Sequence, residues 1–491
     1  MLRALSDIDW LLIGETLYLA VLVLVCLRII YDTRSSIKTL AYLLLVIFLP
    51  VAGIFFYFSF GINYRKRSLY SKKLLQNVEL MKQIRQRIIT TSRENFRASS
   101  EEIQHYRPLA KLLLRDNLSP LTAGNKVKLL LNGEQKFAEV FEAIENARHH
   151  IHLEYYIIEN DHIGNNLKDL LIKKAKEGVI VRVIYDDFGS RSIRHGFRKE
   201  LQAAGVEVYP FHKIHILFLA NRLNYRNHRK IIVIDSITAF VGGINISDSY
   251  INYSDQQERK PYWRDSHLRI DGPGAFYLQY LFFTDWNFSS QRHLEPESSY
   301  FPKPTDAHGN TVVQLASSGP DSAKPTIMFS ILQAIALAKE EFLLTTPYFI
   351  PGESILDALS IAAMGGVTVR LLVPENSDSF IVNAAARSYF EDLLEVGVQI
   401  YLYQKGFVHA KTLVVDNTLS MVGTANMDYR SFDLNFEVNA VVYDTVFAGE
   451  LREAFFQDLE HAVLLDAAEW KARPVYRQLI EKVFKLISPL L

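Results

Sequence analysis

Two long apolar runs stand near the start of the chain. Residues 11–30 are apolar except for a few positions that include Glu15 and Arg28, and residues 40–60 carry no charge. An α-helix rises about 1.5 Å per residue, so each run is long enough to cross the core of a bilayer. The pattern predicts two transmembrane helices, at about 11–30 and 40–60. A cleaved signal peptide and a buried helical hairpin are the alternatives.

Basic residues follow each apolar run, and the two flanking segments differ in positive charge. The loop between the runs holds Arg34 and Lys38 together with Asp32, and is only slightly positive. The second run is followed by a denser cluster, which consists of Arg65, Lys66, Arg67, Lys72 and Lys73. Short loops with the larger excess of Lys and Arg stay on the cytoplasmic side. The pattern therefore predicts that the rest of the chain lies in the cytoplasm beside the membrane.

Helical and strand patterns then alternate, and the alternation occurs twice. An amphipathic helix leads into the β-rich segment 150–158 in the first copy and 342–350 in the second, and a further helix leads into 178–187 or 366–375. Each copy then reaches a nearly continuous apolar strand that contains a histidine and is apolar on both faces. Such strands, separated by helices, are typical of α/β layers in which helices cover a mostly parallel sheet. We expect an α/β fold with two similar lobes of mixed sheet flanked by helices.

The repeat divides the chain into segments. Between the lobes lies a stretch rich in Ser and Pro that is typical of a linker. The predicted segments are the transmembrane helices in 1–68, a helical juxtamembrane linker in 69–126, the first lobe in 127–294, a linker in 295–319, the second lobe in 320–464 and an amphipathic C-terminal segment in 465–491.

Composition narrows the chemistry. Lys plus Arg and Asp plus Glu both total 54, so no global charge favours a nucleic-acid partner. The only cysteine, Cys26, lies in an apolar run, which excludes a disulfide framework and a thiolate metal site. His212, His215 and His267 have no repeated context, and we treat them as ordinary histidines. We expect no metal and no cofactor.

One short motif, HxKxxxxD, recurs at matching places in the two copies. An asparagine follows each motif at the same distance, in VGGIN and in VGTAN. A single copy of the motif is a weak signal, whereas two copies with matching asparagines are a strong one. The candidate catalytic residues are His228, Lys230 and Asp235 in the first copy and His409, Lys411 and Asp416 in the second, and the candidate phosphate-binding residues are Asn245 and Asn426.

Strand geometry separates the members of the motif. Side chains two residues apart on a strand point to the same face, so each histidine projects together with its lysine toward one phosphate. Asp235 and Asp416 have the opposite parity, and although they belong to the motif we expect them to brace the local fold. The amide groups of Asn245 and Asn426 follow glycine-containing turns and are suited to donate to a phosphoryl oxygen.

The paired motifs with their asparagines resemble the phospholipase D superfamily over roughly 127–462. The resemblance implies one active site formed across a pseudo-two-fold interface, with one histidine as nucleophile and the other as general acid and base. It also implies an orienting carboxylate from outside each motif, for which Asp265 and Glu437 occupy the matching places. The family favours His228 as the nucleophile, but near-identical motifs leave the assignment open.

Further segments, among them HLEYY, YWRDSHLRIDGPG and SMVGTANMDYRSFDLNFEVN, are similar to bacterial cardiolipin synthases. This resemblance implies a multi-pass protein of the bacterial inner membrane that joins two phosphatidylglycerols into cardiolipin and releases glycerol. The alternatives are a membrane phospholipase D or another phosphatidyl-transferase that uses water or a different alcohol, a nuclease-like phosphodiesterase, and a non-catalytic lipid-binding protein. The expected partners are the phospholipid and the membrane, with no nucleic acid. The oligomeric state is left undetermined.

Two apolar segments are candidates for contact with the bilayer. Residues 214–223 insert aliphatic and aromatic side chains just before the first motif, where the second copy has only a short connection. Residues 475–491 have the spacing of an amphipathic helix. Packing against the protein core is the alternative for both segments.

Overall fold

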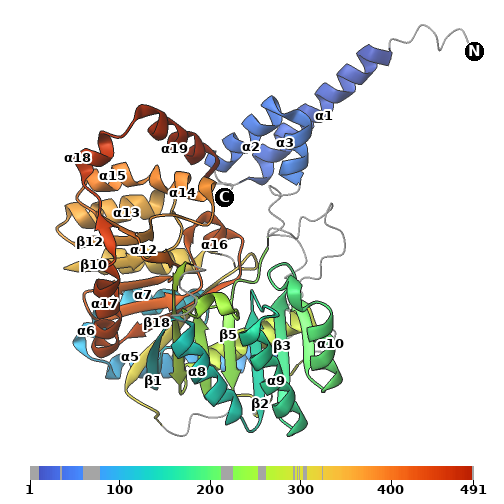
Figure 1. Ribbon diagram of the computed structural model, residues 1–491, viewed down its shortest axis with the longest axis vertical. Coiled ribbons are helices and arrows are strands. Elements are labelled where there is room, and N and C mark those ends of the chain that lie inside the picture. The colour runs from blue at the N-terminus through green and yellow to red at the C-terminus, as the bar shows by residue number, and fades with distance from the viewer. Residues whose placement is uncertain are drawn as a thin grey trace, which may run out of the picture.

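A continuous mixed sheet runs through the centre of the protein (Figure 1). The computed structural model describes residues 10–33, 36–58, 78–211, 225–252, 261–290, 294–295, 297, 299–301, 307–322 and 324–488. Within these ranges the sheet has fifteen strands, in the order β19-β13-β12-β10-β15-β16-β18-β9-β1-β8-β6-β5-β2-β3-β4. The α/β prediction is confirmed, but the two lobes share one sheet.

Helices and strands alternate within each half of the chain. The first half contains β1 (Thr122–Leu131), α8 (Asn132–Glu145), β2 (His150–Tyr155), α9 (His162–Lys176), β3 (Ile180–Asp186), α10 (Gly196–Ala203), β4 (Glu207–Phe211), β5 (Lys230–Ile234), β6 (Thr238–Gly242), β7 (Tyr262–Arg264), β8 (Ser266–Asp271) and α11 (Ala275–Ser289). The second half contains β9 (Thr311–Ser318), α12 (Thr326–Leu337), β10 (Glu341–Thr345), β11 (Phe349–Ile350), α13 (Glu353–Met364), β12 (Thr368–Pro374), α14 (Phe380–Arg387), α15 (Phe390–Glu395), β13 (Gln399–Tyr403), β14 (Gly406–Val408), β15 (Thr412–Val415), β16 (Leu419–Gly423), β17 (Met427–Asp428), α16 (Tyr429–Asp433), β18 (Glu437–Tyr443), α17 (Thr445–Leu459) and β19 (Ala462–Leu464).

The strand order repeats outward from the centre. β1 and β9 pair antiparallel in the middle of the sheet. From β1 the order is β8, β6, β5, β2, β3 and β4, and from β9 it is β18, β16, β15, β10, β12 and β13. The outer three strands of each series are parallel, and the inner ones are antiparallel. The two halves are therefore related by a pseudo-two-fold arrangement, with β5 and β15 as equivalent strands.

The motif strands are apolar on both faces because each face has its own core. In β5, Ile231 and Val233 pack on one side with α11, whereas Ile232 and Ile234 pack on the other in a cluster that includes α9. Alternate side chains of a strand point to opposite faces, so this double burial explains the near-continuous apolar run. Both motif strands are thereby fixed inside the sheet.

Two segments predicted as linkers belong to the folded body. The predicted linker 295–319 contains β9, a central strand, because its run of Val, Gln, Leu and Ala is buried and Gln314 is hydrogen bonded to Ala110 O and Ser119 O. From residue 78 on, where the structure describes it, the predicted juxtamembrane linker contains three helices, α5 (Val78–Ala98), α6 (Glu101–His105) and α7 (Arg107–Asp116). Leu109 and Leu113 of α7 are fully buried in the core of the second half.

The N-terminal region differs from its prediction. Its helices are α1 (Trp10–Asp32), α2 (Ser36–Phe48) and α3 (Pro50–Phe56). Within the described residues, α1 is the one helix long and apolar enough to cross a membrane, over Leu12–Asp32. The helix breaks at Leu49, whose backbone leaves the helical region before Pro50, and α3 folds back so closely that a Cβ on Gly53 would meet Leu45 O at 2.4 Å. Two spanning helices are therefore not confirmed.

Two short helices end the chain. They are α18 (Ala467–Lys471) and α19 (Val475–Ile487). Figure 1 shows α19 at the same end of the molecule as α2 and α3. The apolar segment 214–223 and the basic cluster after the second apolar run lie outside the described residues, as do His212 and His215.

Candidate active site

Each motif histidine stands where its half of the chain is joined to the other half. His228 lies just before β5, and its backbone N–H donates to Phe436 O at 3.0 Å. His409 lies just before β15, and its backbone N–H donates to Arg264 O at 2.7 Å. A short parallel pair of β14 with β7 extends the second junction. The two histidines therefore lie at equivalent positions of the interface between the halves.

Each imidazole is paired with a carboxylate from the opposite half. His409 Nδ1 is hydrogen bonded to Asp265 Oδ2 at 2.7 Å. His228 Nδ1 lies 3.0 Å from Glu437 Oε1. Both carboxylates are fully buried, whereas the histidine side chains keep 18% and 13% exposure for His228 and His409. With Nδ1 held on the buried side, Nε2 is the nitrogen of each ring that remains available to react.

The motif lysines lie beside their own histidines. Lys230 Nζ donates to His228 O at 2.8 Å. Lys411 Nζ donates to His409 O and lies 2.9 Å from His409 Nδ1. Both pairs therefore project on one side of their strands.

Burial perturbs the titration of these groups. It lowers the pKa of Lys230 to about 8 and the pKa of Lys411 to about 7, and Lys230 adds to the shift of Lys411. It also lowers the pKa of His409 to about 4, with Lys411 as the next cause, and it lowers the pKa of His228. Lys230 also contributes to the lowered pKa of His409, so the charges of the two motifs act on one another across the interface. An anion placed between them would favour the charged lysines.

The side chains of Asn245 and Asn426 differ in their hydrogen bonds. Asn245 Nδ2 donates to Tyr250 OH at 2.7 Å, and Asn245 Oδ1 accepts from Ile157 N at 3.3 Å. Asn426 is also buried, but its Oδ1 has no hydrogen-bond partner. The side-chain oxygen of Asn426 therefore lacks the backbone contact that the side-chain oxygen of Asn245 makes.

Asp235 and Asp416 lie at the far ends of their strands from the histidines. Asp235 accepts from the backbone N–H groups of Arg148, His149 and His150, at 2.8 to 2.9 Å. Asp416 does the same for Lys339, Glu340 and Glu341. Both occupy left-handed turn conformations, with φ of 52° and 49°. Their contacts are those of braces that hold the β5–β6 and β15–β16 turns against the preceding strands.

Sequence reasoning missed the aromatic walls of the site. The Tyr156 ring lies 4.3 Å from the His228 ring, centroid to centroid, and Trp263 and Phe407 lie 5.4 and 5.8 Å from His409. Trp263 and Phe407 come from the paired strands β7 and β14. Their signal in the sequence is weak because neither has a counterpart in the other copy.

Sequence reasoning also missed the glycine beside Asp265. A Cβ on Gly243 would meet Asp265 Oδ1 at 2.1 Å, so the carboxylate occupies the space that a side chain would fill. Thr424 stands at the equivalent place in the other half, and its hydroxyl donates to Glu437 Oε2. The Asp265 carboxylate thus lies in the space left by a glycine, whereas the Glu437 carboxylate is held by a hydrogen bond from a threonine.

The fold and the site together define the class of protein: two α/β repeats form one composite centre, to which each contributes a histidine, a lysine and a carboxylate, as in the phospholipase D superfamily. The model of the family "Cardiolipin synthase, PLD-like domain" matches residues 140–258 and 331–459, and "Phospholipase_D-nuclease N-terminal" matches 19–61. The chain belongs to the cardiolipin synthase family of this superfamily.

Curated relatives and a solved structure agree with this assignment. The chain is 40% identical to the cardiolipin synthase of Alkalihalophilus pseudofirmus, covering 94% of this chain and 91% of the relative. It is 38% identical to the major cardiolipin synthase ClsA of Bacillus subtilis, covering 97% and 98%. A phosphatidylserine synthase structure from Haemophilus influenzae superposes with a TM-score of 0.57 and 15% identity, over 78% of this chain and 100% of that one, and supports the fold alone.

Proposed function

We propose that this protein is a cardiolipin synthase that transfers the phosphatidyl group of one phosphatidylglycerol to a second one, and releases glycerol. The observation that carries the proposal is the crossed pairing of the two histidines with Asp265 and Glu437 in one composite site. Two imidazoles on one phosphorus provide both a nucleophile and a proton carrier. The cardiolipin synthases similar to this chain along most of its length supply the choice of substrate.

The first step forms a covalent intermediate. Nε2 of His228 attacks the phosphorus of the first phosphatidylglycerol, and the bond between phosphorus and the glycerol head-group oxygen breaks. His409 gives a proton to that oxygen, and glycerol leaves. Burial and Lys411 lower the pKa of His409 to about 4, so its imidazole is neutral near pH 7. A bound phosphodiester anion offsets the lysine charge and raises the proton affinity of the ring.

The second step reverses the first with a new alcohol. The terminal hydroxyl of a second phosphatidylglycerol attacks phosphorus, its proton passes to His409, and the bond between phosphorus and His228 breaks. Cardiolipin leaves and both histidines are restored. Transfer competes with hydrolysis, so the hydroxyl has to be positioned in line while water is excluded. Tyr156, Trp263 and Phe407 line the histidines with the apolar surface that this requires.

The lysines and Asn426 stabilise the charge that develops on the phosphoryl oxygens. Ammonium and amide donors that are already in place act strongly in a buried site because little reorganisation is needed at the moment of reaction. Lys230 and Lys411 are both buried and lie beside their histidines. We assign Asn245 a supporting role, since its amide already donates to Tyr250.

We further propose that the protein works at the bacterial inner membrane, with its catalytic halves on the cytoplasmic side. The long apolar helix α1 exposes Leu17 and Leu24 to 65% each. The side prediction rests on the basic residues that follow the second apolar run in the sequence. A membrane-held site meets phospholipids at high effective concentration.

Helix α19 provides a second apolar surface. Part of it packs on the body, since Phe484 contacts Phe380 at a centroid distance of 5.8 Å. Its other face exposes Leu479 at 62% and Leu486 at 72%. Because α19 lies at the same end as α2 and α3 in Figure 1, we propose that this face rests in the bilayer interface.

The test is product analysis with labelled phosphatidylglycerol. The full chain, in detergent micelles, is expected to give cardiolipin and glycerol in equal amounts. His228→Ala and His409→Ala are expected to give neither, whereas His162→Ala, which removes an exposed histidine of α9, keeps the activity. Phosphatidic acid as the sole product would instead make the protein a hydrolase. Unchanged activity in both site variants would refute the site.

A further inference from the structure

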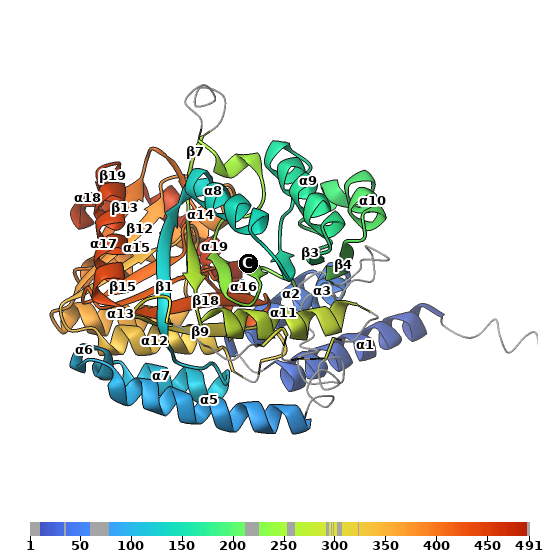
Figure 2. The same ribbon diagram turned by 90° about the horizontal axis from the view of Figure 1, so that it is seen from below.

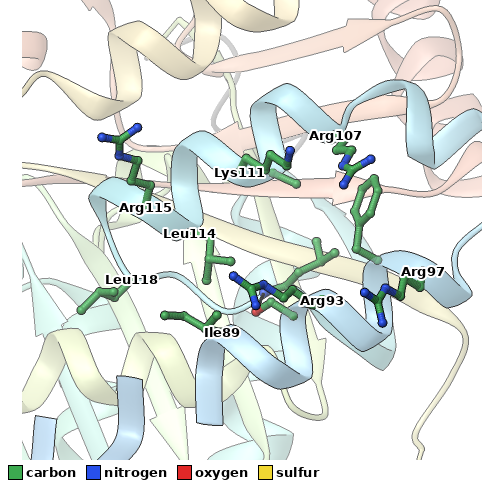
Figure 3. A pocket seen from close by; sticks show the side chains of 12 residues that line it. Ile89, Arg93, Arg97, Arg107, Lys111, Leu114, Arg115 and Leu118 are labelled. Carbon is green, nitrogen blue, oxygen red and sulfur yellow. Dashed lines mark hydrogen bonds between the residues drawn. The ribbon is translucent and has the colours of Figure 1, made fainter. Parts of the chain in front are cut away.

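A groove lies between α5 and α7, apart from the catalytic motifs (Figure 3). Its volume is about 640 Å³, within the range of sites for small ligands. Figure 2 shows α5 and α7 side by side along one edge of the molecule. Ser92 Oγ accepts from Leu121 N at 3.1 Å, and Asn95 Nδ2 donates to Leu121 O at 2.9 Å. These bonds fasten α5 to the start of β1, so the groove is part of the folded body.

The lining is strongly one-sided in charge. Among its twelve residues are five cations and no carboxylate: Arg93 and Arg97 from α5, and Arg107, Lys111 and Arg115 from α7. Within each helix these residues are four apart, and such residues share a face. In a chain whose Lys plus Arg and Asp plus Glu are equal, at 54 each, this local excess favours an anionic ligand.

These cations have no acidic partner in the part of the chain that the structure describes. The Arg107 guanidinium lies over the Phe96 ring at 5.9 Å. Asp116, at the end of α7, accepts from Thr326 Oγ1 and is engaged with α12. The charges on the groove are therefore available to an external anion.

The interior of the groove is apolar. Ile89, Phe96, Leu114, Leu118 and Leu121 line it together with the cations. Figure 3 shows Leu114 pointing from α7 toward Ile89 of α5. A cationic rim around an apolar interior matches a ligand with an anionic head and a hydrocarbon tail, whereas a free phosphate ion would use only the rim.

We propose that this groove binds an anionic phospholipid, with the head-group phosphate between Arg93 and Lys111 and part of an acyl chain along Ile89 and Leu114. The helix itself supports this choice, because α5 is amphipathic, follows the N-terminal apolar segment, and carries five Lys or Arg against two Glu. Basic amphipathic helices next to membrane segments attract anionic lipids. The site is separate from the catalytic centre and does not depend on the proposed reaction.

Photocrosslinking of the full chain tests the proposal. The probe is phosphatidylglycerol with a diazirine on one acyl chain, presented in phosphatidylcholine nanodiscs, and the readout is the yield of labelled peptides from α5 and α7. The matched charge-reversal control is Lys176→Glu with Lys199→Glu, exposed residues of α9 and α10. We expect the control to be labelled as strongly as wild type. In the double variant Arg93→Glu with Lys111→Glu, we expect the labelling yield to fall by about tenfold or more.

Probes with different head groups, and added inorganic phosphate, show whether the groove selects an anionic phospholipid. A phosphatidylcholine probe should label the groove far less than the phosphatidylglycerol probe. Equal labelling by both probes, labelling unaffected by the groove substitutions, or its abolition by millimolar inorganic phosphate would each overturn the proposal. Cardiolipin formation by a chain without groove labelling would overturn this inference alone. Groove labelling of a chain that makes no cardiolipin would overturn the proposed function alone.

Discussion

The two halves of the catalytic site follow one plan but hold their imidazoles differently. His409 Nδ1 has a hydrogen bond of 2.7 Å to Asp265 and also lies 2.9 Å from Lys411 Nζ. His228 Nδ1 lies 3.0 Å from Glu437, without the alignment of a hydrogen bond. The repeat thus provides two equivalent frameworks, and the local contacts make the two histidines chemically unequal. On this contrast rests our proposal that the more tightly fixed His409 carries the proton and His228 attacks phosphorus.

The largest expected effect comes from removing either histidine. His228→Ala and His409→Ala should each lower cardiolipin formation by about 10⁴-fold or more, since residues that act as a unit lose most of the activity together. The difference between the halves appears with a phosphodiester whose leaving group is p-nitrophenolate. That leaving group needs no proton, so His409→Ala should recover much of the first step.

The measurement is the burst of p-nitrophenolate, with acid-quenched protein examined for a phosphohistidine. His162→Ala serves again as the control and should match wild type. A burst in His228→Ala and none in His409→Ala would reverse the assigned roles. No burst in either variant would mean that the halves cannot be separated in this way.

A smaller effect is expected from the lysines, and it depends on pH. A lysine must be protonated to hold the phosphate, and burial lowers the pKa of Lys411 to about 7 and that of Lys230 to about 8. Both lose their charge as pH rises through these values. The ratio kcat/KM reports the free enzyme and already depends on the protonation of His409, whose pKa is about 4; loss of the lysine charges should make it fall more steeply from about pH 7 upward. Bound substrate stabilises the ammonium groups, so kcat should fall only at higher pH.

Substitution of one lysine at a time separates the two halves. Lys411→Met should reduce kcat/KM by about 10²-fold or more and leave a fall near pH 8 from Lys230. Lys230→Met should leave only the fall from Lys411, and should move it above pH 7 because the repulsion from Lys230 is removed. Identical profiles in both variants would show that the lysines titrate as one pair. A profile that stays flat from pH 6 to pH 9 in wild type would contradict the burial argument.

The next effect in size is expected from the residues that hold the carboxylates of Asp265 and Glu437 in place. Gly243→Ala places a Cβ where Asp265 Oδ1 lies, so the carboxylate must move and kcat should fall by about 10²-fold. Thr424→Val removes one donor to Glu437 while keeping the shape, and Asn435 still donates to Glu437 at 3.2 Å. A lost hydrogen bond to a charged group costs about 1.5–3 kcal/mol, and because Asn435 still donates to Glu437 we expect the lower end of this range, which is about a tenfold fall.

Steady-state rates and thermal melting of both variants check this contrast. Thr424→Ser, which keeps the hydroxyl, is the control for the second half. If Thr424→Val proved more damaging than Gly243→Ala, the order of the two supports would be the reverse of the one inferred here.

The sequence predicted the local geometry of this site, because strand parity places His228 beside Lys230 and His409 beside Lys411, as the structure does. It did not predict that His228 pairs with Glu437, since that contact depends on how the halves meet at β1 and β9. It also missed β9 itself, whose apolar run lies among Ser and Pro residues, and the burial of α7 in the second half. Local spacing can be read along the chain, whereas contacts between distant segments are set by the packing of the whole sheet.

The motif aspartates should have the smallest effect on catalysis and should make the halves alike. Asp235 and Asp416 each accept three backbone N–H groups in matching turns, so either Asp→Ala change should lower the free energy of unfolding by about 2 kcal/mol. The kcat per folded molecule should stay within about twofold, since neither carboxylate contacts a histidine of the site. Asp→Asn variants, which keep one acceptor oxygen, should lie between Ala and wild type in melting temperature. A large loss of kcat with an unchanged melting temperature would show that these aspartates take part in catalysis. A loss of kcat in the Asp235 variant alone would show that the two turns, like the two histidines, are not equivalent.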